Sequence, residues 1–229
     1  MLFRSSLEAG YLEYLLGKFA ENPRLGVAGT DYVEETWNSP LSQNRFSNIE
    51  DVTGQCQLFR RECFEAIGGY KPSKLGGVDL VANLEARMLG WETRVYTDKV
   101  LLHHRPHGRA QANRFSVEFV NGRKDYLFGS HPLWATCRAA YRLTTKPFIA
   151  GGVLLLAGYY SAMLTGSKKT VTKSVMKFRR SEQKRRLARI LRGMVLPRSS
   201  RFQRMLGSGL TGLFYIPRVC RICVNWPGY

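Results

Sequence analysis

Asp79 has the sequence surroundings expected of a general base. It follows Gly76, Gly77 and Val78, and it stands at the start of a helix predicted over residues 80–89. Two glycines allow the backbone to approach a ligand closely, because they carry no Cβ atom. A helix N-terminus stabilises a carboxylate and keeps it ionised, so this one could take a proton from a hydroxyl group. The alternative is that Asp79 only caps its helix, and the spacing alone favours that alternative.

His103 and His104 stand together at the end of a strand predicted over residues 100–104. Because successive side chains of a strand point to opposite faces, only one of the two rings can face a given site. A neutral imidazole is a common ligand of divalent metals. On the pattern alone, a surface histidine or a core histidine with satisfied hydrogen bonds is the more frequent interpretation.

The five cysteines do not form a disulfide framework, because their number is odd and they are scattered over the chain. Cys220 and Cys223 make an isolated C-x-x-C pair. A zinc ribbon would need a second pair, and a redox site would stand near a junction of strand and helix. The sequence favours two partly buried thiols over a metal or redox role.

Periodicity indicates the elements that must position these residues. Helical spacing predicts helices over residues 11–21, 61–67, 80–89, 110–128 and 132–144. Short apolar runs predict strands over residues 25–30, 52–60, 92–96 and 100–104. The last two strands flank a turn at Asp98, residues 31–50 are predicted to form a loop, and Asp79 or its neighbour is predicted to cap the helix over residues 80–89.

Basic residues concentrate in the C-terminal third of the chain. Residues 1–146 hold 19 basic and 16 acidic side chains, whereas residues 147–229 hold 16 basic side chains and one acid, Glu182. A near-neutral first part and a basic second part indicate a globular domain tethered by its tail to an anionic partner. Within the tail, residues 168–204 carry 14 basic side chains and hint at an amphipathic helix.

An uncharged segment precedes this basic tail. Residues 148–165 contain 18 residues without a charge, about 27 Å as a helix, but several are glycine or tyrosine. A hydrocarbon core is about 30 Å thick, and a single crossing would separate the two flanks, both of which favour the same side. We therefore expect an interfacial or re-entrant segment rather than a full span. The remaining alternative is a helix buried inside a soluble protein.

Four features, in this order, resemble the C-terminal half of family 2 glycosyltransferases, which have the GT-A fold. They are residues 22–29 (NPRLGVAG), 53–70 (TGQCQLFRRECFEAIGGY), 76–79 (GGVD) with 86–91 (ARMLGW), and 103–106 (HHRP). A weaker similarity extends over about residues 8–192. The resemblance implies an α/β fold, in which a partial GT-A-like domain precedes a helical, membrane-associated C-terminal region.

The resemblance also implies roles for individual residues. It identifies an inverting enzyme that transfers a sugar from a nucleotide donor to an acceptor hydroxyl, with Asp79 as the base. Val78 stands where many relatives have a glutamate, so a single carboxylate is available. Arg87 could pair with Asp79 or with a phosphate. The acceptor side would be formed by Thr53, Gly54, Gln57, Gly76, Gly77, Arg87 and Trp91. A histidine completes the metal site in many relatives, which maps to His103, or alternatively to His104.

The chain departs from this family in its donor half. The nucleotide-binding half of the family comes first and ends in an Asp-x-Asp motif, and no Asp-x-Asp occurs in this sequence. We therefore expect the acceptor half and membrane tail of a longer enzyme. Mg²⁺ or Mn²⁺ is expected in the complete enzyme rather than in this chain. We also expect residues 25–30 to form an unpaired edge of the sheet.

These features predict three regions and a function. Residues 1–128 would form the C-terminal half of a GT-A-like domain, residues 129–167 a helical segment with the apolar stretch, and residues 168–229 a basic amphipathic tail. The predicted function is glycosyl transfer in surface polysaccharide or glycolipid assembly, at the cytoplasmic face of a membrane. The partners would be a nucleotide sugar, a glycan or lipid acceptor and an anionic membrane surface, with no nucleic acid. The alternative is a non-catalytic basic module that binds membrane or RNA.

Overall fold

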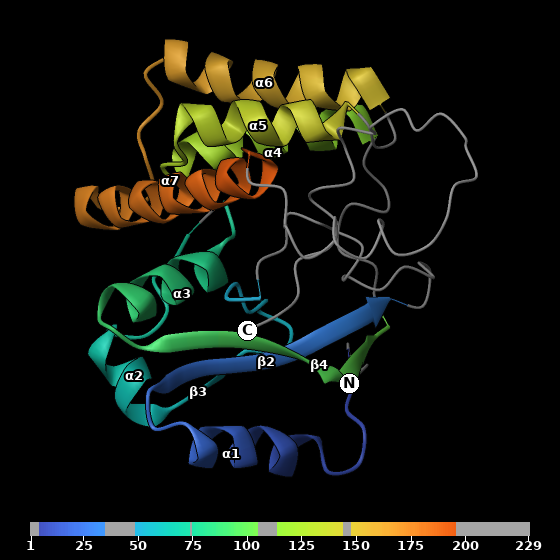
Figure 1. The fold of residues 1–229 in the computed structure, drawn as a ribbon, viewed down its shortest axis with the longest axis vertical. Coiled ribbons are helices and arrows are strands. Elements are labelled where there is room, and N and C mark those ends of the chain that lie inside the picture. The colour runs from blue at the N-terminus through green and yellow to red at the C-terminus, as the bar shows by residue number, and fades with distance from the viewer. Residues whose placement is uncertain (1–4, 35–48, 74, 105–113, 144–147, 196–229) are drawn as a thin grey trace, which may run out of the picture.

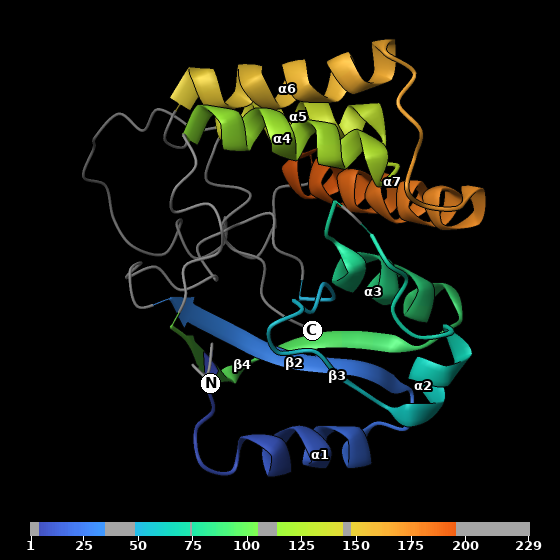
Figure 2. The same cartoon turned by 180° about the vertical axis from the view of Figure 1, so that it is seen from behind.

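The computed structural model describes residues 5–34, 49–73, 75–104, 114–143 and 148–195. It shows a mixed four-stranded sheet, with helix α1 on one face, helix α3 on the other, and a layer of four helices beyond α3 (Figures 1 and 2). The predicted α/β class is therefore confirmed. The predicted cysteine pair at residues 220 and 223 lies outside the described residues.

The sheet has the order β1-β4-β2-β3. Strands β2 (Leu25–Glu34) and β4 (Glu92–His103) are parallel, whereas β1 (Ser5–Ser6) and β3 (Leu58–Phe59) run antiparallel to their neighbours. The prediction that residues 25–30 form an unpaired edge is wrong, because β2 lies between β4 and β3. Its pairing with β3 involves only Val27 and Ala28, so the antiparallel partner is short.

Residues 92–103 form one strand rather than two strands around a turn. Thr30 is opposite Tyr96 and Asp31 is opposite Val100, so residues 97–99 form an irregularity inside a continuous ladder. Asp98 accepts a hydrogen bond from the Tyr14 hydroxyl at 2.7 Å, which ties the irregularity to α1. The predicted turn is therefore a bulge that contacts α1 instead of reversing the chain.

Two hydrophobic clusters lie on opposite faces of β2. Helix α1 (Tyr11–Glu21), predicted with these same bounds, packs Leu15 and Phe19 against Ala28 and its neighbours. On the other face, Val27 packs with residues of α2 (Arg61–Ala66) and α3 (Val78–Met88). The alternation of Val27 and Ala28 between the two clusters is the period of two that a strand imposes.

The segment before β3 is largely a turn, contrary to the predicted strand over residues 52–60. The Cys56 amide donates to the Thr53 carbonyl at 3.1 Å, and only Leu58–Phe59 pairs with β2. Residues 31–34, predicted to be loop, continue β2 because they pair with β4. The predicted helix over residues 61–67 is confirmed, and Gly68 and Gly69 after it have φ values of 72°.

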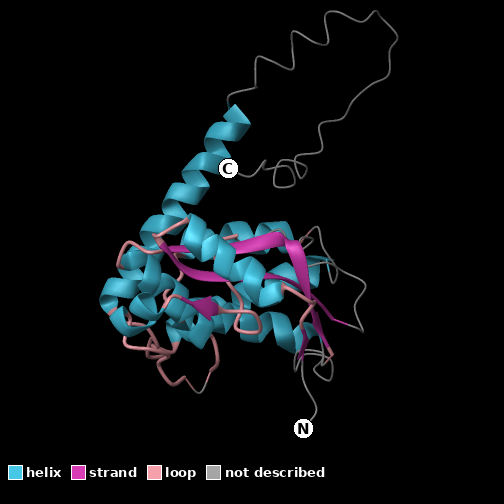
Figure 3. Ribbon diagram, turned by 90° about the horizontal axis from the view of Figure 1, so that it is seen from below, coloured by secondary structure: helices cyan, strands magenta, loops and turns pink. Residues whose placement is uncertain are grey.

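The helical layer consists of α4 (Arg114–Leu127), α5 (Pro132–Arg142), α6 (Phe148–Leu164) and α7 (Lys173–Val195). Helices α4 and α6 pack closely, since a Cβ atom built on Gly158 would lie 2.8 Å from the carbonyl carbon of Phe119. The C-terminal part of α7 extends beyond the rest of the described molecule (Figure 3). Within the described part of the chain, no helix is long and apolar enough to cross a membrane.

Candidate functional site

Asp79 lies in the first turn of α3 but does not cap that helix. The N-cap residue is Gly77, which has a φ of 73° and makes no side-chain capping bond. The prediction that Asp79 or its neighbour is the cap is therefore wrong for Asp79. Its Oδ2 atom instead accepts the backbone N–H of Gly54 at 3.1 Å. Two predicted site residues that are 25 positions apart are thus in direct contact.

Gln57 connects the loop before β3 to the same turn of α3. Its side-chain nitrogen donates to the carbonyl oxygens of Val52 and Asp79 at 3.0 and 3.2 Å, and to Oδ1 of Asn83 at 3.0 Å. Its Oε1 atom accepts the Tyr70 hydroxyl at 2.6 Å. Every polar atom of the Gln57 amide is therefore engaged, and the amide acts as a brace for the loop that carries Gly54.

This loop packs on the C-terminal half of β2. The Cys56 thiol donates to the Thr30 carbonyl at 3.0 Å, and it also contacts the Thr53 hydroxyl at 3.3 Å. A Cβ atom on Gly29 would lie 2.5 Å from the Cys56 carbonyl oxygen, so the close approach requires glycine there. Ligands of open α/β sheets bind beyond the carboxyl ends of parallel strands. The bond to Gly54 holds Asp79 toward the carboxyl end of β2.

Tyr70 belongs to the site, although no role was predicted for it. Burial raises the pKa of its hydroxyl, and the negative charge of Asp79 raises it further. The phenol therefore stays protonated and can donate, as it does to Gln57. The only sequence signal was its position at the end of the motif over residues 53–70, directly after two glycines.

Gly76 and Gly77 both have positive φ, and the surroundings of the two residues differ. A Cβ atom on Gly76 would meet nothing within 4 Å, whereas one on Gly77 would lie 2.5 Å from the ring of Phe128. Gly77 therefore allows the N-terminus of α3 to approach the end of α4. The two glycines were predicted to let the backbone approach a ligand. At Gly77 the close neighbour is instead Phe128, at the end of α4 in the protein's own helical layer.

Arg87 contacts neither Asp79 nor an open surface. Its guanidinium binds Asp51 at 3.1 Å and Glu182 at 3.0 Å, and its side chain is only 8% exposed. It also donates to the Glu50 carbonyl and the Thr93 hydroxyl, so all five of its N–H groups have acceptors. Burial alone would lower the pKa of Arg87, but the charges of Asp51 and Glu182 outweigh it and raise that pKa.

Trp91, predicted on the acceptor side, lies behind α3. It packs against the cluster that includes Ala82 and Ala86 of α3, and a Cβ atom on Gly26 would lie 2.8 Å from the Trp91 Cβ. Trp91 therefore sets the spacing between α3 and β2. It supports the helix that carries Asp79.

The described residues do not fit a site for Mg²⁺ or Mn²⁺. His103 ends β4, opposite Ser5, and the His104 ring nitrogen Nε2 lies 2.6 Å from the Ser6 hydroxyl. No group of three histidine, cysteine, aspartate or glutamate side chains that could hold a metal occurs among the residues that the structure describes. Hard divalent ions need several oxygen ligands, so no step proposed below uses a metal.

Charged side chains occupy the space between α3 and the helical layer. A cavity of about 270 Å³ lies there, lined by the Leu80, Leu84 and Arg87 face of α3 and by residues of α4, α5 and α7. Arg179 of α7 approaches Asp125 of α4 at 3.8 Å. Burial lowers the pKa of Arg179, and Asp125 partly opposes that effect. The layer that carries the basic helix is joined to the Asp79 helix by the ion pair between Arg87 and Glu182.

Comparison with known proteins gave no match to a family model, to a curated protein or to a solved structure. The fold and site define an α/β protein with a mixed four-stranded sheet and a helical layer on one side. The resemblance to family 2 glycosyltransferases stays a prediction.

Proposed function

We propose that this chain provides the acceptor side of an inverting glycosyltransferase, with Asp79 as the general base. One observation supports this above all: the Asp79 carboxylate is not used to cap its own helix and is oriented by the Gly54 amide. A carboxylate held by one oxygen leaves its other oxygen for a substrate proton. The carboxylate stands in the first turn of α3, at the positive end of the helix dipole.

In the proposed reaction, the acceptor hydroxyl gives its proton to Oδ1 of Asp79 while Oδ2 remains on the Gly54 amide. The acceptor oxygen forms a bond to the anomeric carbon of the donor sugar. The bond from that carbon to the diphosphate oxygen breaks, and the nucleoside diphosphate leaves with the electron pair. Attack from the side opposite the leaving group inverts the anomeric configuration. Gln57 and Tyr70 keep the Gly54 loop in place.

The outer face of α6 supports the predicted membrane association. Its buried positions are Gly151, Gly152, Gly158 and Ala162 together with Leu155 and Tyr159, whereas several other large apolar side chains face outward. Ile149 is 70% exposed, and Leu164 is 82% exposed. An apolar helix face that is followed by lysines is the pattern of an interfacial helix on anionic lipid, which fits the proposed cytoplasmic face. This face would also serve the alternative, a basic module that binds membrane without catalysis.

The test is transfer of radiolabelled sugar from nucleotide sugars to membrane acceptors, in membranes from source cells that carry the wild-type gene or Asp79→Asn. Loss of a general base should lower the rate by about 10²–10⁴-fold. Asparagine can still accept the Gly54 amide, so the thermal midpoint of the purified variant should be unchanged. Asp98→Asn is the matched control, because Asp98 lies on the α1 side of the sheet.

The two functions give different outcomes in this assay. If Asp79→Asn transfers sugar as fast as wild type, Asp79 is not the base. If membranes with the wild-type protein and membranes with the variant show no sugar transfer, while both proteins bind vesicles, the non-catalytic module is the better description.

A further inference from the structure

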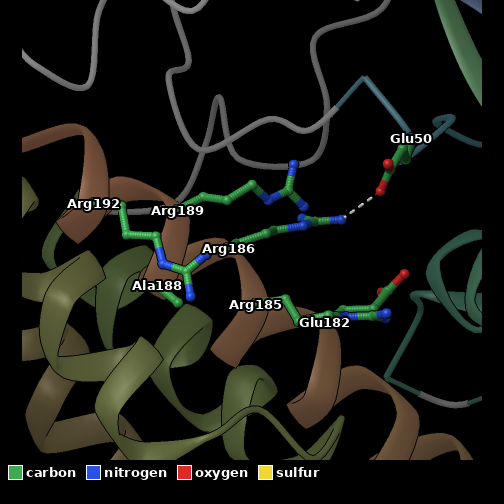
Figure 4. Close-up of a pocket in the computed structure, with 7 residues that line it drawn as sticks. All are labelled: Glu50, Glu182, Arg185, Arg186, Ala188, Arg189 and Arg192. Atoms are coloured by element: carbon green, nitrogen blue, oxygen red, sulfur yellow. Dashed lines mark hydrogen bonds and ion pairs between the residues drawn. The ribbon is translucent and has the colours of Figure 1, made fainter. Parts of the chain in front are cut away.

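Four arginines of α7 line a groove that the proposed reaction does not use. The groove has a volume of about 460 Å³ (Figure 4). Its lining consists of Glu50, Glu182, Arg185, Arg186, Ala188, Arg189 and Arg192. Arg185, Arg189 and Arg192 are exposed and lie at the helical spacing that brings side chains to one face.

The acids of the groove are already engaged. Glu182 binds Arg87 at 3.0 Å, and Glu50 binds Arg186 at 2.8 Å. Ion pairs for Arg185, Arg189 and Arg192 are absent from the described part of the chain. The lining as a whole has four arginines and two glutamates, which leaves a formal charge of +2.

This arrangement has a cost for the protein on its own. Like charges at spacings of three and four residues repel each other and destabilise a helix. Other arginines of α7 avoid such repulsion by having protein acceptors: Arg179 donates to the Phe128 carbonyl and Arg180 to the Gly129 carbonyl. The helix therefore carries arginines of two kinds, one that binds the helical layer and one that is directed into the groove.

We propose that this groove binds a diphosphate group, without a metal ion. Guanidinium groups bind phosphate oxygens through two parallel hydrogen bonds, and they do so better than lysine. The step from Arg185 to Arg192 is about 10 Å along the helix, so the three long side chains can converge on one compact anion, whereas a long polymer would extend past them. A phosphate monoester already carries about −1.5 to −2 charges at neutral pH, and a diphosphate carries more, so one diphosphate group is enough to neutralise the +2 of the lining.

A free nucleoside diphosphate and a lipid diphosphate share this chemistry. The site stands beside Glu182, which binds Arg87 of the Asp79 helix, but it does not depend on sugar transfer. Arg185, Arg189 and Arg192 are exposed, and the C-terminal part of α7 extends beyond the rest of the described molecule (Figure 3). The experiment therefore separates the two sources.

The test is calorimetric titration of the full chain with inorganic pyrophosphate, and separately with inorganic phosphate, in buffer that contains EDTA. Three substitutions together, Arg185→Gln, Arg189→Gln and Arg192→Gln, should weaken pyrophosphate binding at least tenfold. The matched control removes the same charge from the same helix with Lys173→Gln, Lys177→Gln and Lys184→Gln, which are exposed and outside the groove lining, and should change binding less than twofold. Replacing the same three groove arginines by lysine keeps the charge, removes the paired hydrogen bonds and should still weaken binding.

The source of the ligand is read from competition. Displacement of pyrophosphate by vesicles that carry a polyprenyl diphosphate, but not by plain phosphatidylglycerol vesicles, supports a groove that takes a lipid diphosphate. Binding that persists beside both kinds of vesicle supports a soluble diphosphate. Equal displacement by both kinds of vesicle would overturn the proposal in favour of a general attraction to anionic lipid. Equal losses in the groove and control variants would overturn the proposal, as would absence of pyrophosphate binding. Tight binding of an RNA oligonucleotide that pyrophosphate cannot displace would overturn it too. Circular dichroism of the glutamine variant confirms folding, since relief of repulsion should stabilise α7.

Discussion

Replacing Gly158 by alanine should destabilise the protein, although the same change in an ordinary helix is stabilising. A Cβ atom on Gly158 would lie 2.8 Å from the Phe119 carbonyl carbon and 3.1 Å from the Arg123 amide nitrogen. Carbon atoms normally approach to about 3.5–4.0 Å, so α6 and α4 would have to separate by roughly 1 Å. On the opposite side of the same seam, a Cβ atom on Gly122 would meet the Leu155 carbonyl carbon at 2.8 Å.

The size of the effect follows from two opposing terms. Alanine in a helix interior gains about 0.5–1 kcal/mol over glycine, because its backbone has less freedom to lose. Forcing extra volume into a packed seam costs about 1–3 kcal/mol, and backbone atoms such as the Phe119 carbonyl cannot move aside as a side chain can. The steric term should win by about 1–2 kcal/mol. For a chain of this size, that lowers the thermal midpoint by about 2–8 °C.

Gly17→Ala is the matched control for this experiment. Gly17 lies inside α1, and a Cβ atom there would meet nothing within 4 Å. The control should therefore raise the thermal midpoint by about 1–4 °C through the helix term alone. Differential scanning calorimetry of the three proteins measures both effects. A Gly158→Ala protein as stable as the Gly17→Ala protein would refute the close packing of α4 and α6.

Two further predictions concern the helical layer. Burial and the cations of α7 lower the pKa of His131 from 6.5, so the unfolded chain takes up a proton first as the pH falls. Stability should therefore decrease below about pH 6.5. The His131→Asn variant keeps a capping side chain, so its thermal midpoint should fall less than that of the wild type between pH 7 and pH 5. Val153→Asp on α6 should weaken flotation with phosphatidylglycerol vesicles at least tenfold. Leu16→Asp on α1 is the control and should not weaken it, because the two side chains are similarly exposed, at 55% and 59%. Equal behaviour of the two variants would contradict docking through α6.

Elements fixed by local patterns could be predicted from the sequence. The bounds of α1 follow from apolar spacing ended by Asn22 and Pro23, and α2 is ended by two glycines. Strands were harder, because pairing across the sheet decides their length. The polar residues 31–34 belong to β2 only because β4 is beside them, and residues 52–57 lose strand character to a turn that Cys56 and Thr53 close.

The same distinction applies to the candidate site. The position of Asp79 after two glycines is a local signal, and so is the placement of Gln57 in the preceding motif. The bond from Gly54 to Asp79 joins residues 25 positions apart, and the pairing of Arg87 with Glu182 joins residues 95 positions apart. No periodicity carries such information. Arg87 was therefore expected on the acceptor side, whereas the structure shows it in a buried ion pair with Glu182 of α7.

Arg87 should act as a structural clamp between the Asp79 helix and the basic helix. Its side chain is 8% exposed and that of Glu182 is 12% exposed, so their charges interact with little screening by water. Removing one partner of a buried pair leaves the other charge uncompensated, which costs about 3–5 kcal/mol. Asp51, with a side chain 33% exposed, can recover water and should contribute less.

A double-mutant cycle tests this clamp by urea denaturation. Arg87→Met should lower the free energy of unfolding by about 3–5 kcal/mol, and Glu182→Gln alone by less, because Arg87 keeps Asp51. The double variant should be less destabilised than the sum of the single variants, since neither charge is then left alone. Additive effects would show that the pair does not hold α3 to α7. A stable Arg87→Met protein that transfers sugar with a raised KM would return Arg87 to the acceptor side.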